Sequence, residues 1–125
     1  MIKPDLQPPL TLAYLGDAVY TLLVREHLVK TTTMTPNKLH KKTVSFLCAA
    51  AQAQALDIIS CELDETEQNI VRRGRNAKPG TIPKSAEPAE YMKATAFEAL
   101  IGYLYLDGRD ERIAQLFALV LAGKE

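Results

Sequence analysis

The sequence predicts one all-α domain that spans residues 1–125. Apolar residues recur at intervals of three and four through several segments, as expected on the buried side of a helix. No segment alternates apolar and polar residues in the way that a half-buried strand does. A hydrophobic content of 47% over 125 residues is enough to build a single core without disulfides.

The first two predicted helices cover residues 11–28 and 35–56. Thr11 is the expected N-cap of the first helix, which is apolar nearly all the way round and is therefore expected to be central and buried. Thr35 is the expected N-cap of the second helix, with Pro36 at the first helical position. An alanine-rich stretch continues this second helix, because alanine has the highest helix propensity.

The third predicted helix begins after Asp64, whose spacing to Glu67 is that of a capping box. Gly74 is its expected C-cap. Residues 74–86 are rich in Pro and Gly and poor in apolar residues, and a loop of this length in a small domain is usually functional or disordered. The last two predicted helices cover residues 88–106 and 111–121.

Charged residues are balanced in number but unevenly placed. The chain has 15 Lys and Arg and 15 Asp and Glu, so it is not a simple polycation. No acidic residue lies between Glu26 and Asp57 or from Arg72 to Lys84, and both stretches contain several basic residues. Basic segments of this kind bind polyanions when the fold brings them together, but they are also common on solvated surfaces.

The chain is expected to be cytoplasmic, with no membrane segment. Its N-terminus lacks the basic and then apolar layout of a signal peptide. The longest apolar stretch, around residues 10–24, includes Gly16 and Asp17 and is too short to span a bilayer. Cys48 and Cys61 show no metal-ligand spacing and are expected to be reduced thiols.

Two acidic residues stand alone in apolar helices. Asp17 is the only charged residue between Asp5 and Arg25, and Glu98 is the only one between Lys93 and Asp107. Buried acids are costly unless they are paired or bind a metal ion. The two helices could pack together so that both carboxylates bind a divalent cation such as Mg²⁺ or Mn²⁺. The alternative is that each acid forms a structural salt bridge, for instance with Arg25 or Lys93.

Two segments resemble the motifs of a known family. Residues 12–19 (LAYLGDAV) resemble the ribonuclease III signature LEFLGDAVL, and residues 95–108 (TAFEALIGYLYLDG) resemble its second acidic motif, DxxEALIGAxYLDG. The basic stretch over residues 72–78 and the lack of a double-stranded-RNA-binding domain resemble the Mini-ribonuclease III branch, which consists of the catalytic domain alone. The resemblance spans essentially the whole chain.

The resemblance implies a ribonuclease III-type endonuclease domain that cuts double-stranded RNA and leaves 5′-phosphate and 3′-hydroxyl ends. It assigns Asp17 and Glu98 as catalytic and metal-binding residues, with Mg²⁺ as the cofactor and Mn²⁺ as a substitute. Two of the four acids of the family are replaced, by Ala13 and Thr95. These replacements leave open whether the site holds one metal ion or two, and whether Thr95 packs or holds a metal-bound water.

Without a separate RNA-binding domain, the catalytic domain is expected to grip the duplex itself. The irregular segment is basic and has no aromatic residue for stacking, which favours a duplex over a single strand. The predicted RNA-binding residues are Arg73, Arg75, Asn76, Lys78 and Lys84.

The resemblance further implies a homodimer that matures the large-subunit (23S) ribosomal RNA precursor, with a ribosomal protein presenting the RNA. A cut through both strands needs two active sites, and a twofold dimer supplies the second. The alternative is a ribonuclease III-like module that has lost catalysis and serves as an RNA-bound or ribosome-associated scaffold. Ala13 and Thr95 favour this alternative, whereas the two lone acids argue against it.

Overall fold

The computed structural model describes residues 2–78, 82 and 84–124, and every regular element within them is helical. The predicted all-α fold is therefore confirmed. The elements in chain order are η1 (Pro4–Leu6), α1 (Pro9–Thr31), α2 (Pro36–Leu47), α3 (Ala49–Ile59), η2 (Ser60–Glu62), α4 (Glu65–Asn76), α5 (Pro88–Leu106) and α6 (Asp110–Gly123).

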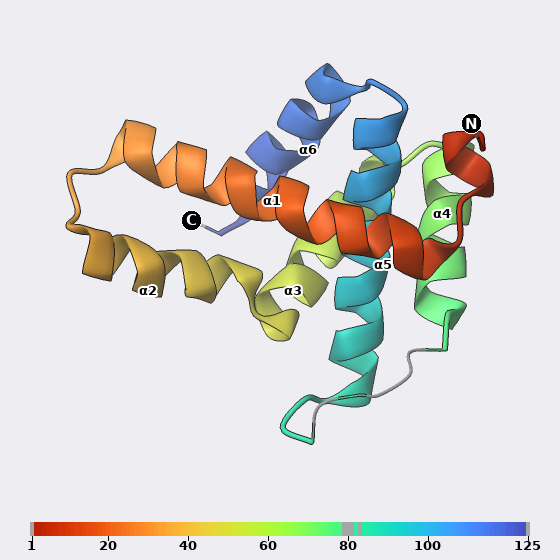
Figure 1. Cartoon of the computed structure of the whole chain (residues 1–125), viewed down its shortest axis with the longest axis horizontal. Coiled ribbons are helices and arrows are strands. Elements are labelled where there is room, and N and C mark those ends of the chain that lie inside the picture. The colour runs from red at the N-terminus through yellow and green to blue at the C-terminus, as the bar shows by residue number, and fades with distance from the viewer. Residues whose placement is uncertain (1, 79–81, 83, 125) are drawn as a thin grey trace.

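Helix α5 forms the centre of the domain, and α1 crosses it (Figure 1). Helices α3 and α4 also pack against α5, and α6 contacts both α3 and α5. Most residues of α5 between Ala94 and Leu104 are buried. The C-terminal half of α1 and the antiparallel α2 extend to one side of this core (Figure 1). The two motif segments found in the sequence therefore lie on the two helices that pack most extensively against each other.

Helix α1 differs from its prediction at both ends. It begins at Pro9 with Pro8 as the N-cap, rather than with Thr11, and it continues to Thr31. A proline is tolerated at the first helical position because its missing N–H would have no partner inside the helix. The predicted N-cap at Thr35 and the first position at Pro36 are confirmed for α2.

The predicted single helix over residues 35–56 is two helices. Cys48 has an extended backbone (φ −63°, ψ 155°) and separates α2 from α3. The two segments are bent by 57° relative to each other. Alanine-rich composition favours helix but does not set its direction, and the break allows α3 to pack against α5.

Gly74 lies inside α4 and is not its C-cap, so this prediction was wrong. The helix continues to Asn76, and Ala77 is the C-cap. A Cβ atom on Gly74 would lie 2.8 Å from the Cα atom of Ala96 in α5, so the glycine is required by close packing of the two helices. Arg75 and Asn76 are consequently helical, while residues 79–81 and 83 of the predicted loop lie outside the described residues.

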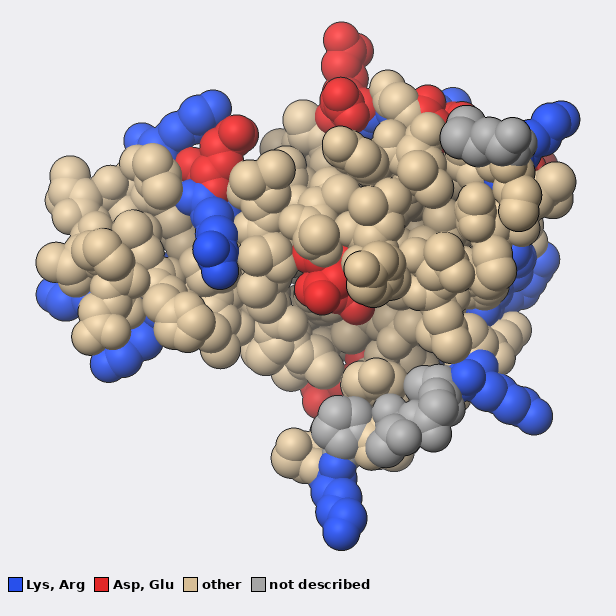
Figure 2. All heavy atoms as spheres, viewed as in Figure 1, with Lys and Arg blue, Asp and Glu red and all other residues tan. Residues whose placement is uncertain are grey.

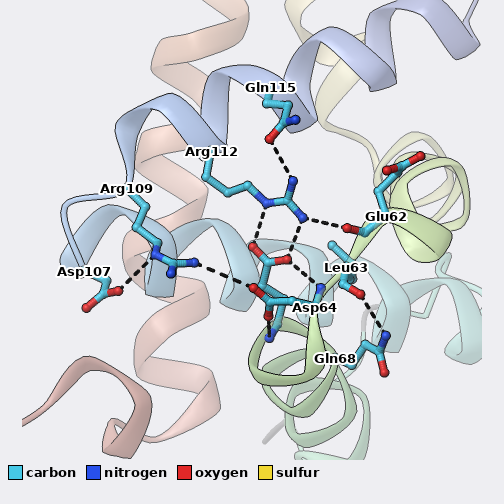
Figure 3. Close-up of polar contacts among 9 residues, drawn as sticks. Glu62, Leu63, Asp64, Gln68, Asp107, Arg109, Arg112 and Gln115 are labelled. Carbon is cyan, nitrogen blue, oxygen red and sulfur yellow. Dashed lines mark hydrogen bonds and ion pairs between the residues drawn. The ribbon is translucent and has the colours of Figure 1, made fainter.

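The predicted capping box of α4 is confirmed, and its glutamate also links α4 to α6. Glu67 is completely buried, accepts a hydrogen bond from the backbone N–H of Asp64, and pairs with Arg112 at 2.7 and 2.8 Å. Figure 3 shows Arg112 reaching from α6 toward the start of α4, where it also contacts the Glu62 carbonyl oxygen. Breaking such a buried, hydrogen-bonded pair leaves an uncompensated charge and is strongly destabilising.

No single helix in the described part of the chain is long and apolar enough to cross a membrane. Helices α2 and α3, with the turn η2, meet the length and composition criteria only as a bent pair. This is weak evidence for a span, because core helices of soluble proteins meet the same criteria, and α3 is packed into this core.

Candidate active site

The site begins where α1 and α5 touch through two glycines. A Cβ atom on Gly16 would overlap the carbonyl oxygen of Glu98, and one on Gly102 would overlap that of Leu12. The two backbones are therefore in direct contact, which only residues without a side chain permit. Asp17 follows Gly16 directly, so this contact brings it to Glu98.

Asp17 and Glu98 are neighbours across this crossing. Asp17 is exposed on α1, and Glu98 is partly buried on α5. Burial, first, and the adjacent negative charge of Asp17, second, together raise the pKa of the Glu98 carboxyl to about 8. Figure 2 shows acidic side chains in the middle of the face on which α1 crosses α5.

The structure does not support the salt-bridge alternative for these acids. Among the described residues, neither carboxylate forms an ion pair with Lys or Arg. Lys93 pairs instead with Asp57 at 3.0 Å. Arg25 lines a 270 Å³ cavity between α1 and α2. Within the described part of the chain, the two acids are therefore neighbours without a basic partner.

A divalent cation fits this donor set. Carboxylate oxygens are the hard ligands that Mg²⁺ and Mn²⁺ prefer, and Mg²⁺ is commonly bound through one or two carboxylates while water and substrate phosphate complete its coordination. A cation beside the pair would favour the ionised form of Glu98, which burial and the negative charge of Asp17 disfavour. Residues 2–78, 82 and 84–124 contain no group of three or more His, Cys, Asp and Glu side chains that could hold a metal ion.

The two positions at which the family has further acids show ordinary packing. Ala13 is buried in α1. The Thr95 hydroxyl donates a hydrogen bond of 3.0 Å to the carbonyl oxygen of Tyr91, one turn earlier in α5. The Thr95 hydroxyl proton therefore forms a hydrogen bond within α5.

One polar neighbour of the site was missed in the sequence. Gln52 of α3 is 3% exposed, and its Nε2 donates a long hydrogen bond of 3.5 Å to Glu98 Oε2. The sequence feature that could have pointed to Gln52 is a polar glutamine within the alanine-rich stretch. Its neighbour Gln54 gives the same signal and is exposed, so sequence alone could not distinguish them.

The predicted RNA-binding residues lie in three places. Arg75, Asn76 and Lys78, together with Arg72, line a 620 Å³ cavity between α4 and the start of α5. Lys84 is exposed in the turn before α5.

Arg73 lies apart from this cavity. Its guanidinium donates hydrogen bonds to the carbonyl oxygens of Asp5 and Gln7 at 2.7 and 2.9 Å. It therefore ties α4 to the N-terminal segment.

One side of α1 is exposed although its composition predicts burial. Tyr14 is 84% exposed and Leu22 is 66% exposed, and Leu10 lies on the same row at four-residue spacing. An apolar row of this kind on a single chain is typical of a surface that another protein covers.

The matching family model and the curated relatives agree on one family. Residues 10–109 match the ribonuclease III domain. The chain is 50% identical to "Mini-ribonuclease 3" of Brevibacillus brevis over 94% of its own length and 90% of the relative's. It is 41% identical to the protein of the same name from Staphylococcus aureus, over 90% of this chain and 86% of that one. A crystal structure of a protein from Fusobacterium nucleatum superposes with a TM-score of 0.84 at 33% identity and covers 94% of this chain and 93% of that chain.

Proposed function

Because this chain belongs to the ribonuclease III family, in its Mini-ribonuclease 3 branch, and is an endoribonuclease, we propose that it cuts double-stranded RNA at a metal site formed by Asp17 and Glu98. The observation that carries the proposal is the direct contact of α1 and α5, which places two carboxylates together without a basic partner among the described residues. In a module without catalytic activity, two neighbouring carboxylates would destabilise the fold with no metal site to compensate.

Asp17 of α1 and Glu98 of α5 would hold the ion. When bound there, Mg²⁺, or Mn²⁺ in its place, would supply Lewis-acid chemistry for phosphodiester hydrolysis. The expected products carry 5′-phosphate and 3′-hydroxyl ends. Replacement of the other two acids by Ala13 and Thr95 favours a site with fewer protein ligands than in the full family pattern.

The basic cavity is proposed to bind the duplex through its backbone. Arg75, Asn76 and Lys78 line it, and no acidic residue lies among its described lining residues. A-form RNA is recognised mainly by its shape, its phosphates and its 2′-hydroxyls, which suits this mixture of basic and amide groups. Lys84 would extend the contact, and Arg73 would contribute mainly by holding α4 against the N-terminal segment.

A homodimer would provide one active site for each strand. The exposed apolar row of α1 is the surface proposed for this twofold interface. Sedimentation should show a dimer for the wild type and a monomer for Leu22→Lys, which places a charge in this row. A stable monomer in an active wild-type preparation would contradict the proposed assembly.

The large-subunit (23S) ribosomal RNA precursor is the proposed substrate, in the cytoplasm, with a ribosomal protein presenting the RNA. The support is the similarity to the family branch and not the geometry of the site.

A cleavage assay on duplex RNA tests the proposed activity. Wild type should cut in Mg²⁺ and stop in EDTA, and Asp17→Asn and Glu98→Gln should each lose the activity. Glu26→Gln is the matched control, because Glu26 is an exposed acid on α1 that pairs with Lys30 at the surface. Near wild-type cleavage by either site variant would remove the metal-site assignment.

A further inference from the structure

Gln52 is a buried polar side chain whose position needs a physical reason. Its neighbours on the buried face of α3 are small or aliphatic, among them Ala55, Leu56 and Ile59. Burying an amide among such residues is costly unless it forms hydrogen bonds. Among the described residues, the side-chain partner of Gln52 is Glu98.

The contact has a chemical effect on the site. An amide N–H that donates to a carboxylate favours the ionised form, so Gln52 opposes the rise in the Glu98 pKa that burial and Asp17 cause. It also restrains the orientation of a side chain with three rotatable torsions. Metal ligands are commonly oriented by such hydrogen-bonded neighbours, which are not ligands themselves.

We propose that Gln52 is a positioning residue of the metal site, whose amide orients the Glu98 carboxylate toward Asp17 so that both acids face one divalent cation. This inference rests on the proposed function, because it concerns the same cation. It makes α3 the third helix of the site, after α1 and α5.

Gln52→Met tests the inference, because methionine has a similar length and no hydrogen-bond donor. Gln54→Met is the matched control, since Gln54 lies exposed on the same helix. We expect the affinity of the metal-free protein for Mg²⁺, measured by titration calorimetry, to fall about 10- to 100-fold in Gln52→Met. The melting temperature in EDTA should stay within a few degrees of wild type. The KM for duplex RNA at saturating Mg²⁺ should not change.

The outcomes separate this inference from the proposed function. If wild type and Glu98→Gln bind Mg²⁺ equally, the metal site itself is wrong. If Glu98→Gln loses Mg²⁺ while Gln52→Met binds it as wild type does, the metal site stands and the role of Gln52 is overturned. A lower melting temperature with intact Mg²⁺ affinity would also overturn it, by making Gln52 purely structural. Gln52→Ala, which also lacks the amide, decides the question if the methionine variant does not fold.

Discussion

Removing the charge of Glu98 should stabilise the protein when no metal is bound. The folded pKa of this carboxyl is about 8, against an ordinary value of 4.5, so the folded protein holds its proton more strongly than the unfolded chain. The fully ionised form is therefore unfavourable in the folded state, and stability decreases as pH rises between these two values. At pH 7 this lowers the free energy of unfolding by about 3 kcal/mol, because pH 7 lies about 2.5 units above the ordinary pKa and each unit corresponds to about 1.4 kcal/mol.

Glu98→Gln avoids this cost because its amide cannot ionise. The variant offers Gln52 one acceptor oxygen instead of two, so we expect part of this contact to be lost and a net gain of about 1–3 kcal/mol in the free energy of unfolding at pH 7 in EDTA. This corresponds to a rise in melting temperature of about 4 °C for each kcal/mol. Thermal unfolding of both proteins at pH 5, 7 and 9 measures the difference. The gain should be small at pH 5 and should level off above pH 8.

Magnesium should reverse the order of the two proteins. A cation that binds only the folded state stabilises it, and it should do so for wild type and not for Glu98→Gln. A melting temperature for Glu98→Gln below wild type in EDTA, at every pH, would show that the Glu98 carboxylate is already compensated. The lack of a basic partner at Glu98 would then no longer be a reason to propose a cation at this site.

Three further changes test other parts of the structure. Burial alone would raise the pKa of Glu67, but the hydrogen bonds from Arg112 and Asp64 and the nearby positive charges outweigh it and lower this pKa. The ionised Glu67 carboxylate should therefore stabilise the fold above its ordinary pKa, and this contribution should be lost as the pH falls through the lowered pKa. If Glu67→Gln leaves the loss of stability at acid pH unchanged, the prediction is refuted. Gly102→Ala should cost about 1–3 kcal/mol in urea unfolding, because the added Cβ overlaps the α1 backbone, whereas an ordinary helix would gain from the exchange. Wild-type stability would mean that the helices are not in contact there. Replacing Arg75 and Lys78 by Ala should weaken duplex binding and make its dependence on salt concentration less steep, by about one counterion for each lost phosphate contact. If affinity and salt dependence are unchanged, the duplex binds at another surface, such as the lysines of α2.

Local signals in the sequence predicted much of the helical framework. The capping box of Asp64 and Glu67 and the start of α2 at Pro36 depend on residues within one turn of each other, so they can be read without the fold. The two candidate acids were also found locally, because Asp17 and Glu98 each stand alone among apolar neighbours.

The tertiary structure decided what depends on contacts between distant segments. Gly74 reads as a helix terminator by propensity, yet it lies within α4 because α5 approaches too closely for a side chain. Gln52 reaches Glu98 from 46 positions away only because the break at Cys48 turns α3 toward α5. Likewise, the apolar composition of α1 predicts burial all round, but the other described helices leave its outer row exposed. Short-range patterns determine which segments are helical, whereas packing determines which of their faces meet.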